Sequence, residues 1–393
     1  MKDTSRRAVI IVMDSVGCGA LPDASRFHDR GASTLGHLAA HFGKLNLPHL
    51  AGLGLGKIVD LKIKVNKIEG SYGRMHEVSN AKDTIIGHWE IAGVLSKKPF
   101  PLYPEGFPPE LMAEYEKRIG RKTLGNYPMS GTEILKQLGG EHYRTGFPIV
   151  YTSGDSVFQI AAHEKIVPLK LLYQWCNIAR KMLTGKHGVG RVIARPFVGM
   201  PGQFKRTYNR KDFSLESPRK TLLDEIKSKG MKVVGIGKIG DIFAHRGTTR
   251  EIHTEGNADS LKRTVISLKS MKGNGLVFTN LVDFDSLYGH RRDPEGYYGA
   301  LREFDSYLPA VKKSMRKEDI LIITADHGCD PLYRKHTDHT REYVPLLVYS
   351  PSAESRSLGT RTTFSDVART LDEYFGLGKI KNGRSFLEEI WKK

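Results

Sequence analysis

The feature of this sequence that most constrains its fold is a set of short apolar runs, each ending at a charged residue. Short runs rich in Val and Ile and bounded by turns are typical of buried parallel strands. An open sheet of such strands binds ligands just beyond the carboxyl ends of its strands, so we expect the chemistry of this protein along one edge of a sheet. The runs, each with the residue at which it ends, are 9–13 before Asp14, 233–237 before Lys238, 276–282 before Asp283 and 320–325 before Asp326.

The order of the predicted elements indicates an α/β fold. In residues 1–98 and 215–393 strands alternate with helices, and such alternation predicts a mainly parallel sheet sandwiched between helices. The expected strands are 8–13, 232–236, 276–282, 319–324 and 345–349. The expected helices are 34–42, 257–270, 296–315 and 365–375.

Two linker-like stretches delimit an insertion in this pattern. Five prolines between residues 98 and 109 exclude a regular helix or a central strand there. The second stretch, 209–218, precedes a helical pattern that begins near Thr221. Strands at 149–151 and 191–195 and a helix at 169–183 are expected inside the insertion, which makes it an α+β unit. The predicted domains are a core of residues 1–98 and 215–393 and an inserted domain of residues 99–214.

Length and composition favour a protein of more than one domain in the cell interior. A chain of 393 residues, 39% of them hydrophobic, can bury a sizeable core. Its apolar runs are far shorter than the roughly 18 residues of a membrane helix, and the run at 9–13 is too short for a signal peptide. Three cysteines are too few for a disulfide framework, so we expect a reducing, cytoplasmic compartment and no membrane partner.

The formal net charge of +18 is the one unusual bulk property of the chain. Clustered Lys and Arg side chains would indicate a nucleic-acid-binding protein, because they release counterions from phosphate backbones. Here the basic residues are spread in ones and twos and no run of five occurs, which favours a generally basic surface and no nucleic-acid partner. A module that binds nucleic acid or an acidic partner stays as the alternative outside catalysis.

Aspartate and histidine residues follow the predicted strands in a pattern typical of a divalent-metal site. Each one alone could be a turn or capping residue, but the whole set is hard to explain without a metal. Because no cysteine pair has zinc-finger spacing, Mn²⁺, Mg²⁺ and Zn²⁺ all stay open as the bound ion. The residues of this set are Asp14, Asp283, Asp285, His290, Asp326, His327, Asp338 and His339.

A two-metal site stabilises phosphoryl transfer and activates a coordinated hydroxyl as the nucleophile. Thr84 is the candidate hydroxyl, and its alternative role is that of N-cap for a helix beginning near Gly87. Several arginines of the inserted domain are suited to bidentate binding of a phosphate, although a solvated basic surface explains any one of them equally well. They are Arg191, Arg195, Arg206 and Arg210.

Eight longer motifs are specific enough to compare with known families. They are VMDSVGCGALPDA, AKDTIIGHWE, YTSGDSVFQIAAHE, GRVIARPFVG, GIGKIGDIFAHRG, NLVDFDSLYGHRRDP, TADHGCDP and TDHTREYVPLLVYSP. From about residue 8 to the C-terminus, the chain closely resembles the phosphopentomutase family of the alkaline phosphatase superfamily. The resemblance implies an alkaline-phosphatase-like core with an inserted, mobile cap domain. It also implies interconversion of ribose 1-phosphate and ribose 5-phosphate, and of the 2-deoxyribose pair, in nucleoside salvage.

The resemblance further implies a role for each matching residue. One metal would be held by Asp285, His290 and His339, and the other by Asp14, Asp326, His327 and the oxygen of Thr84. Thr84 would also carry the phosphoryl group. The implied residues that bind the sugar and its distal phosphate are Ser153, Asp155, Val157, Arg191, Ile193 and Arg206 of the cap and Lys238 of the core.

The resemblance likewise implies cofactors and partners. The metals would be two Mn²⁺ ions, with Mg²⁺ or another divalent ion as an alternative. Glucose 1,6-bisphosphate or a pentose bisphosphate would prime the cycle as an activator. We expect pentose phosphates as substrates and a monomer as the oligomeric state, with an oligomer as the alternative.

Three places depart from the family pattern. Ala81 replaces a glycine, and Ile85 and Ile86 stand where smaller or polar residues are common, so the nucleophile loop is expected to be stiffer. His336 takes the place of a glycine, but the match around His339 favours His339 as the metal ligand. Metal ligands alone do not distinguish a mutase from a phosphomonoesterase or a phosphoglycerate mutase of the same superfamily. The cap motifs and the threonine nucleophile favour the pentomutase.

Overall fold

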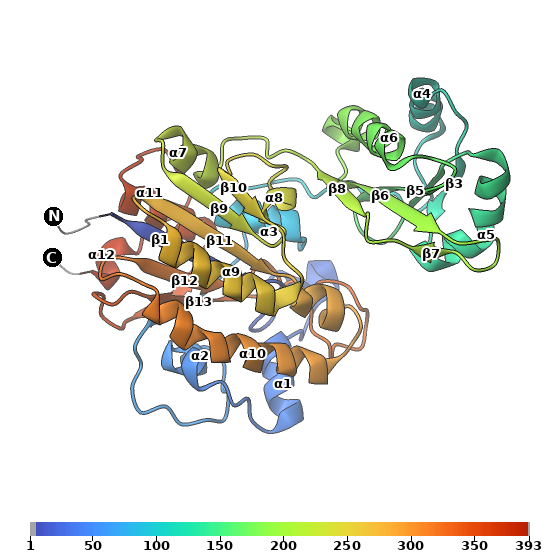
Figure 1. Ribbon diagram of the computed structural model, residues 1–393. Coiled ribbons are helices and arrows are strands. Elements are labelled where there is room, and N and C mark those ends of the chain that lie inside the picture. The colour runs from blue at the N-terminus through green and yellow to red at the C-terminus, as the bar shows by residue number, and fades with distance from the viewer. Residues whose placement is uncertain (1–4, 392–393) are drawn as a thin grey trace. The chain divides into compact units, whose positions relative to one another are not determined.

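The structure, a computed structural model, describes residues 5–391 and divides them into two compact units (Figure 1). Unit 1 consists of the described parts of Met1–Lys98 and Ser217–Lys393, and unit 2 of Pro99–Glu216. The division therefore falls at residues 98/99 and 216/217, where the sequence predicts 98/99 and 214/215. Among the described residues, no helix is long and apolar enough to cross a membrane.

Unit 1 is built on an eight-stranded sheet, counted over the described residues, with the order β10-β9-β11-β1-β12-β13-β2-β14. Neighbouring strands run parallel from β10 to β12, and β13 runs antiparallel to both β12 and β2. The predicted α/β fold with a mainly parallel sheet is thus confirmed. The strands are β1 (Arg7–Met13), β2 (Ser71–Met75), β9 (Lys232–Ile236), β10 (Arg250–Ile252), β11 (Gly275–Leu281), β12 (Ile320–Thr324), β13 (Val344–Tyr349) and β14 (Ser357–Arg361).

Helices cover both faces of this sheet. Helices α9 and α10 pack together on one face, and α3, α7, α8 and α11 lie on the other (Figure 1). Every residue of β1, β11 and β12 is buried, which is why these strands are nearly continuous apolar runs. The helical segments are η1 (Ala24–Phe27), α1 (Thr34–Phe42), α2 (Pro48–Gly52), η2 (Leu55–Lys57), α3 (Thr84–Ile91), α7 (Leu222–Ser228), α8 (Ile239–Ile242), α9 (Gly256–Ser270), η4 (Phe284–Gly289), α10 (Pro294–Lys313), α11 (Ser365–Phe375) and α12 (Leu387–Ile390).

A buried arginine ties together the amino-terminal ends of the central strands of unit 1. The guanidinium of Arg7, which is 1% exposed, donates hydrogen bonds to both carboxylate oxygens of Asp319. It also donates to the backbone carbonyls of Leu268 and Ser314. A buried charge is tolerated only when it is paired and hydrogen-bonded, and Arg7 meets both conditions at the end of the sheet opposite to Asp14.

Unit 2 contains a second, smaller sheet with the order β3-β4-β5-β6-β7, in which β8 also pairs with β6. Its side chains alternate between two apolar clusters, as the two-residue period of a strand requires. Ile149 and Tyr151 of β4 point to the cluster under α5, whereas Val150 points to the cluster under α4 and α6. The elements are α4 (Pro109–Ile119), β3 (Leu124–Pro128), α5 (Gly131–Thr145), β4 (Ile149–Thr152), β5 (Val157–His163), α6 (Leu169–Met182), η3 (Gly185–His187), β6 (Arg191–Val198), β7 (Lys205–Arg206) and β8 (Lys211–Ser214).

A buried histidine makes the stability of unit 2 depend on pH. His142 of α5 donates from Nδ1 to the carbonyl of Phe147 and accepts at Nε2 from the amide of His163, at 2.7 and 2.8 Å. Burial lowers the pKa of His142. Between the ordinary histidine pKa of about 6.5 and this lower value, the unfolded chain binds one more proton at His142 than the folded chain. The free energy of unfolding therefore falls as the pH falls through this range.

We expect His142→Gln to remove this contribution, because an amide can hydrogen-bond but does not titrate. As the pH is lowered from 7 to 5, the wild type should lose stability relative to the variant by at most about 1.4 kcal/mol per pH unit. Chemical unfolding at several pH values measures the difference. His41→Gln, at a half-exposed position of α1, is the control and should retain the wild-type pH dependence. An unchanged pH dependence in His142→Gln would contradict the prediction.

Candidate metal centre

The carboxyl ends of three neighbouring strands bring the predicted ligands together. Strand β1 lies between β11 and β12, and all three run parallel. Asp14 follows β1, Asp285 lies in η4 after β11, and Asp326 follows β12. Because parallel strands end at the same edge, these three carboxylates meet there although they are far apart in the sequence.

A first group of side chains consists of Asp14, Asp326 and His327, whose ligand atoms lie within 4.8 Å of one another. Nε2 of His327 is 3.4 Å from Oδ1 of Asp14 and 3.4 Å from Oδ2 of Asp326. The hydroxyl of Thr84 lies 3.2 Å from the same nitrogen. All three ligand residues are buried, so water competes poorly for their ligand atoms. We call this set, with Thr84, the Asp14 cluster.

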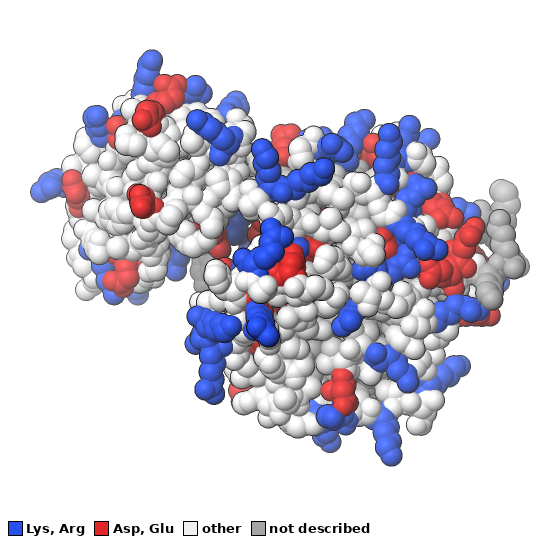
Figure 2. Space-filling view, turned by 180° about the vertical axis from the view of Figure 1, so that it is seen from behind, with Lys and Arg blue, Asp and Glu red and all other residues white. Residues whose placement is uncertain are grey.

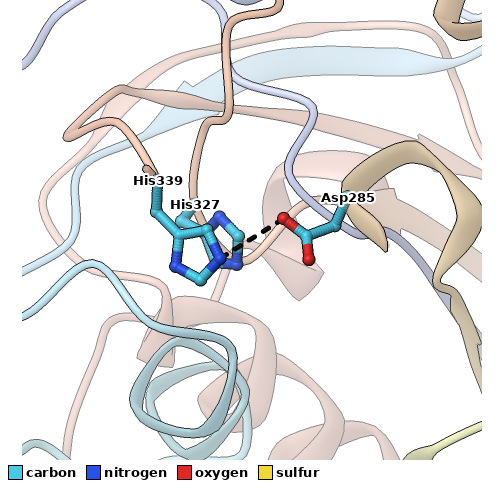
Figure 3. A group of neighbouring side chains, drawn as sticks. All are labelled: Asp285, His327 and His339. Atoms are coloured by element: carbon cyan, nitrogen blue, oxygen red, sulfur yellow. Dashed lines mark ion pairs between the residues drawn. The ribbon is translucent and has the colours of Figure 1, made fainter. Parts of the chain in front are cut away.

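A second group surrounds Asp285, and we call it the Asp285 cluster. Oδ1 of Asp285 is 3.3 Å from Nε2 of His339 and 3.4 Å from Nε2 of His290. The ring of His339 stacks on that of His327 with a centroid separation of 3.9 Å, so the two clusters adjoin. Figure 3 shows the carboxylate of Asp285 facing the imidazoles of His327 and His339.

Cys329 is a side chain near this cluster that the sequence did not single out. Its sulfur is 4.0 Å from Nδ1 of His290, and it belongs with Asp285 and His290 to a third group of ligand atoms within 4.8 Å. The thiol is buried, and burial raises its pKa well above the ordinary value. Its position directly after His327 and Gly328 was the signal available in the sequence.

His336, the alternative to His339, lies elsewhere. Nε2 of His336 pairs with Oδ1 of Asp29 at 2.7 Å. Nε2 of His339 is 3.1 Å from Nε2 of His290, and its Nδ1 lies 2.8 Å from the carbonyl of Lys82. The geometry therefore brings His339, and not His336, to the Asp285 cluster.

The electrostatics of the two clusters fit a divalent cation. Burial, and then repulsion by Asp326 and Asp285, raises the pKa of Asp14 well above its ordinary value. Burial also lowers the pKa of His327 to about 4, so this imidazole is neutral and able to coordinate at physiological pH. Several carboxylates packed without a compensating cation are costly, and a bound metal ion removes that cost.

Three carboxylate oxygens at the site also support metal binding. They are buried, lie 3.2–3.4 Å from imidazole nitrogens and accept no regular hydrogen bond within residues 5–391. Buried carboxylate oxygens nearly always have a partner in a folded protein. The residues present therefore fit a metal ligand set. The oxygens are Oδ1 of Asp14, Oδ1 of Asp285 and Oδ2 of Asp326.

Thr84 is the first residue of α3, and the possibility that it caps this helix is wrong. The N-cap is Asp83, whose carboxylate accepts hydrogen bonds from the amides of Ile85 and Ile86 at 3.0 Å. The hydroxyl of Thr84 is therefore directed to His327. Gly87 allows this approach, because a Cβ there would lie 2.4 Å from the carbonyl oxygen of Asp326.

Two further side chains, Asn280 and His88, support the site and were missed by the sequence reasoning. Asn280 donates to Oδ2 of Asp14 at 2.8 Å from within β11. Nδ1 of His88 lies 2.8 Å from the carbonyl of Thr84 and 3.2 Å from Oδ2 of Asp326. Partners of this kind fix the orientation of metal ligands. For Asn280 the available signal was a polar residue near the end of an otherwise apolar strand, and for His88 it was a histidine four residues after Thr84.

The predicted sugar-binding residues of the cap all lie in unit 2. Arg191 opens β6, and its guanidinium is 3.6 Å from Asp155 and 3.8 Å from Asp212. Val157 of β5 pairs with Arg191 and, like Ile193, has a buried side chain. Ser153 accepts a hydrogen bond at Oγ from the amide of Asp155, and Arg206 is exposed on β7. Lys238 belongs to unit 1 and lies between β9 and α8. Of the other two arginines, Arg195 donates to Gln159 and Arg210 forms a bidentate pair with Asp212.

Comparisons with known proteins agree with this geometry. Residues 6–379 match the model of the metalloenzyme superfamily. A phosphopentomutase of Caldanaerobacter subterraneus subsp. tengcongensis is 57% identical over 389 residues, covering 98% of both chains. One of Carboxydothermus hydrogenoformans is 57% identical over 391 residues, covering 98% of this chain and all of the relative, and one of Acetivibrio thermocellus is 54% identical over 389 residues with the same coverage. This chain therefore belongs to the phosphopentomutase family of isomerases, within the metalloenzyme superfamily.

Proposed function

We propose that the protein interconverts ribose 1-phosphate and ribose 5-phosphate, and the 2-deoxyribose pair, through a phosphorylated Thr84. The observation that carries the proposal is the hydroxyl of Thr84, 3.2 Å from His327 and beside two adjoining clusters of Asp and His ligands. Full-length relatives named phosphopentomutase support the substrate class.

The two clusters would hold two divalent metal ions. Bound divalent ions lower the pKa of a coordinated hydroxyl and neutralise the oxygens of a transferring phosphoryl group. The Asp285 cluster would hold one ion through Asp285, His290 and His339. The Asp14 cluster would hold the other through Asp14, Asp326, His327 and the oxygen of Thr84. We propose Mn²⁺, as the family resemblance implies, with Mg²⁺ or another divalent ion as the alternative. The carboxylate oxygens and imidazole nitrogens are donors that suit divalent ions of this kind.

In the proposed cycle, Thr84 first donates a phosphoryl group to the substrate and then accepts one from the intermediate. Phosphorylated Thr84 gives its phosphoryl group to the free hydroxyl of the pentose phosphate, which leaves a pentose bisphosphate and the free threonine. The Thr84 oxygen then attacks the other phosphorus of this bisphosphate, so that the isomeric pentose phosphate leaves and Thr84 is phosphorylated again. Glucose 1,6-bisphosphate or a pentose bisphosphate supplies the first phosphoryl group.

We also propose that residues of unit 2 bind the sugar and its non-reacting phosphate. The guanidinium of Arg191 lies within ion-pair distance of Asp155 and Asp212, at 3.6 and 3.8 Å, and its two terminal nitrogens form a fork suited to bidentate phosphate binding. Holding the non-reacting end orients the sugar and makes transfer to water less favourable than transfer to the hydroxyl. The proposed set is Ser153, Asp155, Val157, Arg191, Ile193 and Arg206, with Lys238 of unit 1.

The surroundings of the protein are proposed on the same basis. Cys18, Cys176 and Cys329 are buried free thiols, which supports a reducing, cytoplasmic compartment. Figure 2 shows basic side chains dispersed among acidic and neutral ones over the face drawn, which disfavours a nucleic-acid partner. We propose a monomer that acts on pentose phosphates.

An assay of the purified protein tests the function directly. With Mn²⁺ and glucose 1,6-bisphosphate, ribose 1-phosphate should be converted to ribose 5-phosphate, as followed by phosphorus NMR. Hydrolysis is the competing outcome, because a phosphomonoesterase of the same superfamily would use the same metal ligands. Release of free phosphate at a rate comparable to isomer formation would contradict the proposal. Activity on phosphoglycerate and none on pentose phosphates would identify the other alternative, a phosphoglycerate mutase.

A further inference from the structure

Arg341 is a buried arginine whose contacts converge on the segment that precedes Thr84. Its side chain is 2% exposed, and it lies between β13 and the loop that carries His339. Nη1 donates to the carbonyl oxygens of Ser79 and Ala81, at 2.8 and 2.5 Å. Nη2 donates to the carbonyl of Glu77 at 2.7 Å. One guanidinium thus binds three backbone carbonyls of residues 77–81. We call residues 77–84 the nucleophile loop.

Two carboxylates fix the guanidinium of Arg341. Oε2 of Glu77 accepts from Nη1 at 2.5 Å, and the carboxylate of Asp23 accepts from Nε and Nη2 at 3.2 Å. Charge-assisted bonds with a planar guanidinium are directional, so this arrangement restrains both the position and the orientation of the group. The carbonyls that it binds are restrained in turn.

The same short segment connects the nucleophile loop to the metal ligands. The amide of Arg341 donates to Oδ2 of Asp29, whose carboxylate also binds the ammonium group of Lys82. Two residues earlier, Nδ1 of His339 lies 2.8 Å from the carbonyl of Lys82. Arg341 and His339 lie two residues apart in one extended segment. They therefore contact neighbouring parts of the nucleophile loop.

Two sets of contacts restrain the nucleophile loop. The amides of Val78 and Ser79 bind the carboxylate of Glu90, and Asp83 caps α3, so these bonds orient the loop relative to its own helix, whose His88 lies 3.2 Å from Oδ2 of Asp326. The bonds from Arg341 add a second restraint, from the segment that holds His339. Effective phosphoryl transfer requires the attacking oxygen to be placed closely, and a displacement of about 1 Å can lower the rate about 100-fold.

We propose that Arg341 is a positioning residue that sets the place of Thr84 relative to the metal ligands. The proposal rests on Thr84 being the nucleophile, as proposed above. Arg341 touches neither substrate nor metal ligands in this role and acts through the backbone of residues 77–82. Lysine carries the same charge but cannot bind three carbonyls and two carboxylates in one plane.

The test compares Arg341→Lys with Arg7→Lys, because Arg7 is an equally buried arginine that holds a carboxylate and backbone carbonyls at the other end of the sheet. Both variants should lower the melting temperature. Only Arg341→Lys should lower kcat, by about 10- to 100-fold, while KM for ribose 1-phosphate stays within about twofold. Hydrogen exchange of the peptide containing residues 77–84 should become faster in Arg341→Lys and stay unchanged in Arg7→Lys.

The outcomes separate this proposal from the proposed function. Absence of mutase activity in the wild type contradicts the function, and hydrogen exchange then still tests the anchoring of the loop. A wild-type kcat, or a loss of kcat no larger than that in Arg7→Lys, overturns the role of Arg341. If Arg341→Lys does not fold, Asp23→Asn releases the guanidinium from its more exposed side and should lower kcat in the same direction by about threefold. An unchanged kcat in Asp23→Asn would then overturn the proposal.

Discussion

Replacing Thr84 with alanine is expected to reduce mutase turnover by about 10⁴-fold or more while the protein still binds metal. The variant removes the protein oxygen that the proposed cycle phosphorylates. Asp14, Asp326 and His327 stay in place, and their ligand atoms lie within 4.8 Å of one another without Thr84. Steady-state assays measure the turnover, and titration calorimetry with Mn²⁺ measures the metal affinity.

A second measurement on the Thr84 variants follows the covalent step itself. After incubation with glucose 1,6-bisphosphate, intact-protein mass spectrometry should detect one phosphoryl group on the wild type and none on Thr84→Ala. Thr84→Ser is the matched control, because it retains the hydroxyl and should be phosphorylated. Substantial turnover in Thr84→Ala would refute the covalent role of this residue.

Asp326→Asn should weaken metal binding itself, which precedes phosphoryl transfer. Oδ2 of Asp326 is one of the buried carboxylate oxygens without a regular hydrogen bond, and the Asp14 cluster loses an anionic ligand when it becomes an amide. We expect the affinity for Mn²⁺ to fall by more than the 10- to 100-fold that is usual for loss of a supporting residue. Activity should fall with it, because an unneutralised phosphoryl group transfers slowly.

The metal-free protein should also be affected by Asp326→Asn. Asp326 raises the pKa of Asp14 by repulsion, after burial, but its contacts with His327, His88 and the amide of Ser15 lower its own pKa. The ionised carboxylate therefore stabilises the folded protein, so the melting temperature of the metal-free variant should fall, and the increase on adding Mn²⁺ should be lost. Asp330→Asn is the control, because Asp330 is a buried carboxylate nearby that binds Ser33 and His37 and is outside both clusters. A normal Mn²⁺ affinity in Asp326→Asn would contradict the assignment of Asp326 as a ligand.

Much of the core was predictable because its strands are buried on both faces. The predicted strand 232–236 coincides with β9, and 8–13 differs from β1 only by Arg7. The charge of Arg7 is tolerated inside the sheet because its guanidinium pairs with Asp319. The edge strand β14 and its neighbour β2 are absent from the predicted strands, because only alternate residues of β2 are buried.

The helices of unit 2 differ from the expectation based on local rules. The proline run predicts no regular helix, yet α4 begins at Pro109, the last proline of that run. Proline is well suited to the first turn of a helix, where its missing amide is not needed. Helix α5 was not predicted at all, and it contains the adjacent Gly139 and Gly140, which lower helix propensity.

The local and chemical properties of this protein can be recognised in its sequence. They are the alternation of buried strands and helices, the aspartates and histidines after those strands and the motifs shared with the family, since each depends on residues close together in the chain. The fold sets which distant groups meet. It brought His339 and not His336 to Asp285, gave the cap of α3 to Asp83 and placed Arg341 against residues 77–81. The physical reason is that these contacts depend on the packing of segments up to about 300 residues apart, which no local pattern encodes.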